Sequence, residues 1–173
     1  MELGSERLFK GCFCLKFRAG FTLVEMLIAV TISIVLVGMG VASYLQFADR
    51  LEVRQAGKEF LVTIRGVQKR SQSGEKPPTC PDKLVGWQIS RVNETSYRVG
   101  ALCGGSGLVG EEISVLPGEA KFITSGFSVS FLGLGGGVNG AGNIVLGDMD
   151  GKYRYTIGID SGGGITEIGL EAN

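Results

Sequence analysis

Apolar residues follow three different patterns along the chain, and each pattern predicts a different element. The first pattern, from Phe21 to Val41, is an almost continuous apolar run in which Glu25 is the one charged residue. A helix needs about 20 apolar residues to cross a bilayer. We therefore predict a transmembrane helix over residues 21–43.

The second pattern is a stripe of apolar residues at helical spacing. The stripe contains Val53, Ala56, Phe60, Ile64 and Val67. The steps between these residues are 3, 4, 4 and 3, which is the periodicity of one helix face. Because no proline occurs before Pro77, we predict one helix over 21–71, with residues 44–71 as its amphipathic half. A coiled-coil dimer is an alternative use of the stripe, although the stripe is only about two heptads long.

The third pattern consists of short segments that follow a polar stretch ending in Pro77 and Pro78. The strand candidates are Leu84–Ser90, Ser96–Cys103, Glu112–Leu116, Phe127–Leu132, Asn143–Leu146, Tyr153–Asp160 and Ile165–Leu170. Several of them alternate between apolar and polar residues, as half-buried strands do. Asp150-Gly151 and Ser161–Gly164 are typical of hairpin connections. Residues 72–173 are thus predicted to form an antiparallel β-rich domain packed on the helix, which makes the fold class α+β.

Composition supports this division and excludes several functions. The chain has 29 glycines, most of them at or beyond Gly100, as expected for many tight turns. It has no histidine, which removes the usual general base and the commonest zinc ligand. We find no serine or cysteine paired with a plausible base. We therefore expect no enzymatic activity, no cofactor and no metal site.

The charges before the apolar run predict an orientation in the membrane. The flanking basic residues are Arg7, Lys10, Lys16 and Arg18, against the acidic Glu2 and Glu6. Basic flanks stay in the cytoplasm, so we expect a single-pass protein of the cytoplasmic membrane with an extracytoplasmic C-terminal domain. A secretory signal peptide is the alternative, but the run is too long and lacks a good cleavage site after it. Neither interpretation explains Glu25, because an ionisable group in such a segment costs free energy unless it has a partner.

The residues Gly20-Phe21-Thr22-Leu23-Val24-Glu25 resemble the prepilin signature of type IV pilins and type II secretion pseudopilins. Each part of that signature occurs at its expected position: a basic leader, a glycine, an aromatic residue, an acid and an apolar helix. The resemblance implies that a prepilin peptidase cuts between Gly20 and Phe21 and removes residues 1–20 as a cytoplasmic leader. It also implies that Phe21 becomes N-methylated.

The same resemblance implies a role and partners for Glu25. In a filament, the carboxylate of one subunit would meet the new N-terminal amine of its neighbour. The implied partners are other pilin or pseudopilin subunits, the inner membrane and, indirectly, an assembly platform and its ATPase. The implied filament is of the type IV pilus or type II secretion kind.

The four cysteines fall into two pairs on opposite sides of the apolar run. Cys12 and Cys14 lie in the leader, where a reducing cytoplasm would keep them unpaired. Cys80 and Cys103 lie in the extracytoplasmic domain and bracket its first predicted hairpin. We expect a disulfide between Cys80 and Cys103, and two free thiols are the alternative.

The order of elements near the C-terminus adds a weaker resemblance. Phe127–Phe131, Asn143–Leu146 and Tyr153–Asp160, separated by glycine-rich turns, are similar to the minor pseudopilins called GspH- or FimT-like. This resemblance implies a minor subunit whose outer domain primes or caps a filament.

The alternative function is a pilus-associated DNA receptor, which needs a basic surface. The candidate basic residues are Lys69, Arg70, Lys76, Lys83, Arg91 and Arg98. Without its leader the chain has 13 basic and 15 acidic residues, a net charge of −2. This balance disfavours nucleic acid as a partner.

Two short motifs are considered and set aside. Gly135–Gly140 fits the pattern G-x-G-x-x-G, but a strand and not a helix is predicted after it, so we expect no nucleotide site. Asp148-Met149-Asp150-Gly151 resembles the start of a calcium loop, but the later glutamate is missing. We expect a plain turn there.

Overall fold

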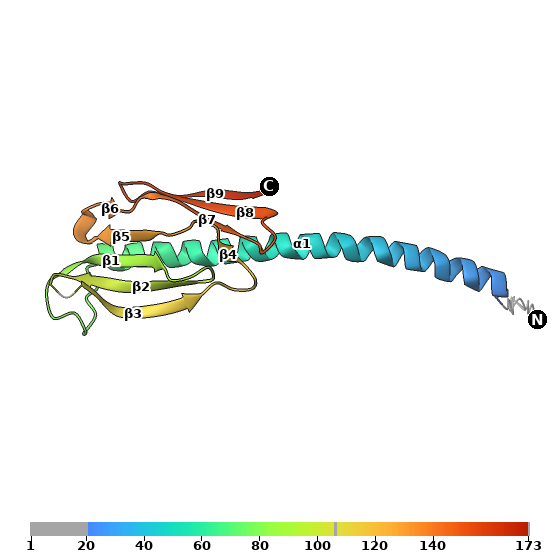
Figure 1. Cartoon of the computed structure of the whole chain (residues 1–173), viewed down its shortest axis with the longest axis horizontal. Helices are drawn as coiled ribbons and strands as arrows, with labels where there is room; N and C mark the ends of the chain where they lie inside the picture. The colour runs from blue at the N-terminus through green and yellow to red at the C-terminus, as the bar shows by residue number, and fades with distance from the viewer. Residues whose placement is uncertain (1–20, 106, 173) are drawn as a thin grey trace, which may run out of the picture. The chain divides into compact units, whose positions relative to one another are not determined.

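The computed structural model describes residues 21–105 and 107–172. In this part of the chain one α-helix is followed by nine strands and a short 3₁₀ turn (Figure 1). The elements are α1 (Leu23–Gln72), β1 (Leu84–Arg91), β2 (Ser96–Cys103), β3 (Gly107–Val115), β4 (Lys121–Phe122), β5 (Ser128–Leu132), η1 (Gly133–Gly135), β6 (Val138–Asn139), β7 (Gly142–Gly147), β8 (Tyr153–Ile159) and β9 (Ile165–Ala172). The chain divides into two compact units, Met1–Ala42 and Ser43–Asn173. The predicted leader, residues 1–20, lies outside the described residues.

Helix α1 has a defined cap at each end. The backbone N–H of Glu25 donates to the Thr22 hydroxyl at 3.2 Å, so Thr22 is the N-cap and the helix begins two residues later than predicted. At the other end Gly74 has φ 66°, which a glycine adopts without strain. Its N–H donates to the Ser71 carbonyl at 3.2 Å, and the N–H of Glu75 donates to that of Arg70 at 3.0 Å. These bonds stop the helix at a left-handed C-terminal turn.

The first unit exposes its apolar side chains. Every residue of the range 21–41 whose side chain is described is exposed, including Phe21 at 72%. In the described part of the chain, no helix combines the length and the apolar composition that a membrane crossing requires. Helix α1 runs without a break from this segment into charged residues and on to Gln72, in line with the single continuous helix predicted from the sequence.

The second unit buries the apolar stripe of α1, as predicted. We name Val53, Ala56, Phe60, Ile64 and Val67 the inner stripe, and each is at most 3% exposed. Two antiparallel sheets pack on it, with the strand orders β3-β2-β1-β5-β6 and β4-β7-β8-β9. Figure 1 shows both sheets running alongside this segment of the helix. The stripe thus packs on the chain's own sheets, and the predicted α+β architecture is confirmed.

Aromatic rings fill the centre of this core. Phe60 makes edge-to-face contacts with Tyr97, Phe122 and Phe127 at centroid distances of 5.0, 5.1 and 5.8 Å. Such pairs add stabilisation beyond their buried area. One helix residue therefore contacts β2, β4 and the segment before β5, which ties both sheets to α1.

Most predicted strands agree with the structure to within one or two residues, and β3 is the main difference. It begins at Gly107 instead of Glu112, because Leu102 and Cys103 of β2 pair with Leu108 and Gly107. The glycines in this segment hide the alternation of apolar and polar residues that would indicate a strand. The two-residue strands β4 and β6 were not predicted, since two residues show no periodicity. The predicted hairpin connections at Asp150-Gly151 and Ser161–Gly164 are confirmed.

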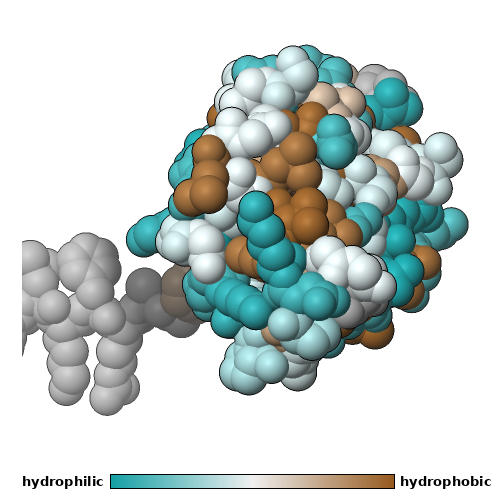
Figure 2. Space-filling model, turned by 90° about the vertical axis from the view of Figure 1, so that its left-hand side faces the viewer, coloured by the Kyte–Doolittle hydropathy of each residue, from teal (hydrophilic) through white to brown (hydrophobic). Residues whose placement is uncertain are grey.

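The connection between β5 and β6 lies at the left-hand end of the domain in Figure 1. Leu134 in this connection is 89% exposed and has φ 55°, the one positive value among described non-glycine residues. Figure 2 looks onto this end and shows hydrophobic side chains grouped among hydrophilic ones. The glycines on either side of Leu134 thus form a turn that leaves its side chain in solvent.

Candidate processing and assembly site

The predicted cleavage site lies just before α1. Gly20 is outside the described residues, whereas Phe21 and Thr22 precede the first helical residue, Leu23. The chain at Phe21 is therefore not locked in helical hydrogen bonds, and its side chain is exposed. A peptidase needs this kind of accessible, non-helical backbone.

Glu25 lies in the first turn of α1. A carboxylate at this end of a helix is favourable, because unpaired N–H groups give the helix N-terminus a partial positive charge. Thr22 and Glu25 also have the spacing of a capping box, in which a threonine and a glutamate three residues apart close the first turn. Sequence reasoning missed Thr22, although the T-x-x-E spacing before an apolar run is a readable signal.

No described residue forms an ion pair with Glu25. Its exposed side chain is surrounded along the chain by exposed apolar side chains. The single chain therefore presents one acid on an apolar helix. The capping geometry explains why a glutamate suits this position, but it leaves the charge of the side chain unpaired.

Cys80 and Cys103 form a disulfide, with their Cα atoms 5.9 Å apart, as the sequence analysis expected. Both cysteines are buried. The bond joins the segment between α1 and β1 to the end of β2. The indole N–H of Trp87 donates to the Glu75 carbonyl at 2.9 Å and holds the same segment. Cys12 and Cys14 lie outside the described residues.

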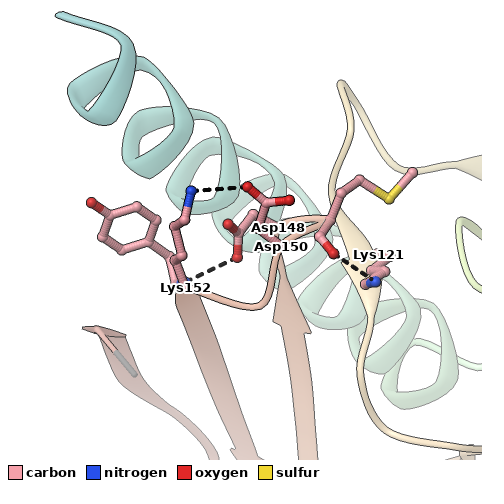
Figure 3. Close-up of polar contacts among 6 residues, drawn as sticks. Lys121, Asp148, Asp150 and Lys152 are labelled. Carbon is pink, nitrogen blue, oxygen red and sulfur yellow. Dashed lines mark hydrogen bonds and ion pairs between the residues drawn. The ribbon is translucent and has the colours of Figure 1, made fainter. Parts of the chain in front are cut away.

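The acidic turn between β7 and β8 is held by bonds within the chain (Figure 3). The N–H of Tyr153 donates to the Asp148 carboxylate at 2.9 Å, and Lys152 pairs with Asp150 at 2.9 Å. Lys121 donates to the Met149 carbonyl at 3.0 Å. Within residues 21–105 and 107–172, no three acidic or cysteine side chains gather in a way that could hold a metal ion.

The ion pair between Lys152 and Asp150 shifts the pKa of both groups. The hydrogen bond and charge of Lys152 lower the pKa of the Asp150 carboxyl, and Asp150 raises the pKa of the Lys152 ammonium. Both groups are exposed, where such pairs add little stability. The ion pair is therefore a surface feature of the turn.

The predicted basic residues for DNA binding are partly engaged elsewhere. The Arg70 guanidinium lies 5.3 Å from the centroid of the Trp87 ring, and Arg98 pairs with Glu111 at 3.4 Å. Arg91 donates to the backbone carbonyls of Asn93 and Thr124. These contacts engage three of the six candidate residues, and one of them, the ion pair of Arg98 with Glu111, offsets a positive charge.

Comparison with known protein families identifies the N-terminal segment. The prokaryotic N-terminal methylation motif matches residues 15–41. The chain therefore carries the motif of prepilins and pseudopilins, which are structural subunits and not enzymes. This motif implies processing by a prepilin peptidase, anchoring in the inner membrane before assembly, and assembly with other pilins. Neither the curated proteins nor the solved structures contain a match to the chain.

Proposed function

We propose that this chain is a minor pilin or pseudopilin, cut between Gly20 and Phe21 and methylated on the new amine of Phe21. The processed subunit polymerises into a filament of the type IV pilus or type II secretion kind. The observation that carries the proposal is the exposed apolar surface of residues 21–41, which directly follows the cleavage motif. An apolar surface of this extent must be covered by lipid or by other subunits.

In this proposal Glu25 pairs with the amine of Phe21 in a neighbouring subunit. Cleavage creates that amine four residues before the acid, and Glu25 has no partner among the described residues of its own chain. An ion pair away from water contributes little net stability, but leaving one partner unpaired costs about 3–5 kcal/mol. The pair therefore selects the register of each incoming subunit more than it strengthens the filament.

The minor, GspH- or FimT-like subtype is supported by the order of elements near the C-terminus. Strands β5, β7, β8 and β9 occur in this order with glycine-rich connections, the first of which contains η1 and the two-residue strand β6. A subunit of this subtype would prime or cap the filament with its outer domain.

Mass spectrometry of the mature N-terminus tests the proposal. The expected product begins at Phe21 and carries one added methyl group on its amine. A Gly20→Ala variant should remain uncut in the same cells, because the peptidase would no longer find its glycine. An intact Met1 in the wild-type protein, or a cut elsewhere, would overturn the proposed function.

A further inference from the structure

A groove of about 250 Å³ lies between the last part of α1 and strands β2 and β3. Its helix wall consists of Thr63, Gly66, Val67 and Arg70. These positions have the spacing i, i+3, i+4 and i+7, so they share one face of the helix. Gly66 has no side chain, and a Cβ added there would meet nothing within 4 Å. The middle of the helix wall is therefore open because a glycine occupies it.

The opposite wall of the groove comes from two neighbouring strands. Val99 of β2 pairs with Glu112 of β3, and Tyr97 pairs with Ser114. All four residues line the groove, and residues two apart on a strand face the same side. Glu112 therefore faces the groove, whereas its neighbour Glu111 lies on the other face of β3.

The groove contains one cation and one anion that do not pair with each other. Arg70 belongs to the helix wall and Glu112 to the sheet wall. Neither forms an ion pair with any residue that the structure describes. The Arg70 guanidinium instead lies 5.3 Å from the centroid of the Trp87 ring, which helps to hold it in place. Two opposite charges that face one groove without meeting are complementary to a ligand that carries both charges.

Hydroxyl groups add a polar site at the Thr63 end of the groove. The Thr63 hydroxyl donates its proton to the Glu59 carbonyl at 3.1 Å. It therefore accepts the hydrogen bond that joins it to the Tyr97 hydroxyl at 3.3 Å, because a threonine hydroxyl has only one proton. The Tyr97 oxygen, whose own proton is used on Thr63, can then accept a hydrogen bond from a ligand. The Ser114 hydroxyl, on the strand position opposite Tyr97, can donate or accept.

We propose that this groove binds a free α-amino acid. The carboxylate of the ligand pairs with Arg70 and its ammonium group pairs with Glu112, because both groups are attached to one carbon and can bridge charges that do not meet. Residues two apart on a strand are separated by about 7 Å, so a polar side chain of the ligand can extend from Glu112 to the hydroxyls of Tyr97 and Ser114. The volume of about 250 Å³ is below the roughly 300–1,000 Å³ of pockets for larger ligands.

Ligands of other charge fit the groove less well. A phosphate or another simple anion would face the Glu112 carboxylate, and a simple cation would face Arg70; like charges placed together cost free energy. An uncharged ligand would use neither charge. Every residue that lines the groove belongs to the second unit, so the inference does not depend on the proposed function.

Calorimetric titration of the full chain in detergent with each of the common L-amino acids tests the inference. At least one should bind with a Kd of about 1 mM or below. For that amino acid, N-acetylation removes the ammonium charge and amidation removes the carboxylate charge. Each change should weaken binding at least about tenfold. If no amino acid binds, or if acetate binds as tightly as the amino acid, the inference is wrong.

Variants on the two walls assign the contacts. Arg70→Gln and Glu112→Gln should each weaken binding at least about tenfold. Lys69→Gln, outside the groove, and Glu111→Gln, on the other face of β3, are the matched controls. Arg70→Gln should also bind the amidated ligand as well as the free amino acid, and Glu112→Gln should no longer discriminate against the N-acetylated one. A structural disturbance would not exchange specificity in this way, so unchanged discrimination in both variants would contradict the inference.

Filling the groove provides an independent measurement. Gly66→Leu should abolish binding, because the new side chain would enter the open middle of the groove. Its thermal unfolding should be retained, since leucine is a good helix former. Gly66→Ala adds one methyl group and should keep most of the affinity. A Gly66→Leu variant that binds the amino acid as tightly as the wild type would show that the ligand lies elsewhere and that the inference is wrong.

Discussion

The two halves of α1 both carry apolar side chains, but these are exposed in the first half and buried in the second. Between Phe21 and Val41 the described apolar side chains are exposed, whereas the inner stripe between Val53 and Val67 is almost fully buried. Both halves are helical in one continuous element. The difference therefore lies in what each half packs against: the second half packs on the chain's own sheets, and the first half has no packing partner among the described residues.

This comparison explains how stability and assembly are divided within one sequence. The second half needs a period of 3.6 residues, because only one of its faces meets the sheets. The first half is apolar on every face, as expected when its surroundings are other apolar surfaces. Substitutions in the first half should therefore change assembly, and those in the second half should change folding of the domain.

The largest effect should come from Glu25→Ala, which we expect to lower incorporation into sheared filaments at least about 100-fold. The loss follows from leaving a neighbour's amine unpaired away from water. Thermal unfolding of the domain should not change, since Glu25 lies in the other unit. Glu59→Gln, an exposed acid in the second half of α1, serves as the matched control for loss of one charge.

Glu25→Gln separates the charge from the helix cap. Glutamine keeps the spacing of a capping box with Thr22, and the backbone bond to the Thr22 hydroxyl, but it has no charge. We expect it to fail in assembly as Glu25→Ala does, measured in the same filament fractions. Normal incorporation of Glu25→Gln would show that the cap matters and the charge does not.

Removing the disulfide should lower the stability of the domain and leave N-terminal processing unchanged, unlike the substitutions at Glu25. In the double variant Cys80→Ser and Cys103→Ser, the free energy of unfolding should fall by about 3 kcal/mol, because the bond closes a loop of 23 residues. Urea unfolding of the processed chain, with and without reductant, measures the loss. Cleavage before Phe21 should be unaffected. A wild-type protein equally stable under reducing conditions would contradict this estimate.

Gly57→Ala should destabilise the packing of the second half of α1 on Tyr155 of β8. A Cβ at Gly57 would lie 2.2 Å from Cδ1 of Tyr155, so the helix or the ring must move, at a cost of about 1–3 kcal/mol. Gly66→Ala is the matched control, because nothing lies within 4 Å of its added Cβ. That control should be neutral or stabilising by up to ~1 kcal/mol, since alanine favours a helix over glycine. Chemical unfolding of both variants measures the difference.

The sequence was sufficient to predict elements that carry a long or regular pattern. The inner stripe, the strands β1, β2, β8 and β9, and the pairing of Cys80 with Cys103 all follow from periodicity or from position. It was insufficient where a contact decides the structure. Gly107 pairs with β2 in spite of the low strand preference of glycine. The sequence around Gly57 likewise does not indicate that the Tyr155 ring lies against it.

The smallest effect concerns Tyr155, whose buried hydroxyl has no hydrogen-bond partner in the described part of the chain. Burial raises the pKa of the Tyr155 phenol, and the nearby Glu167 carboxylate raises it further. The unfolded phenol has a pKa of about 10, so the unfolded state loses its proton first as the pH rises. The contribution to stability is therefore complete below about pH 10 and declines above it.

Tyr155→Phe should remove this alkaline decline, because phenylalanine keeps the ring against Gly57 and has no proton to lose. Urea unfolding of the processed chain between about pH 8 and about pH 11 measures the slope. Tyr44→Phe, at an exposed position of α1, controls for the loss of one phenol. Equal slopes for the wild type and Tyr155→Phe would mean that the Tyr155 hydroxyl reaches water in the folded state, and that this part of the second unit is less tightly packed than the inner stripe beside it.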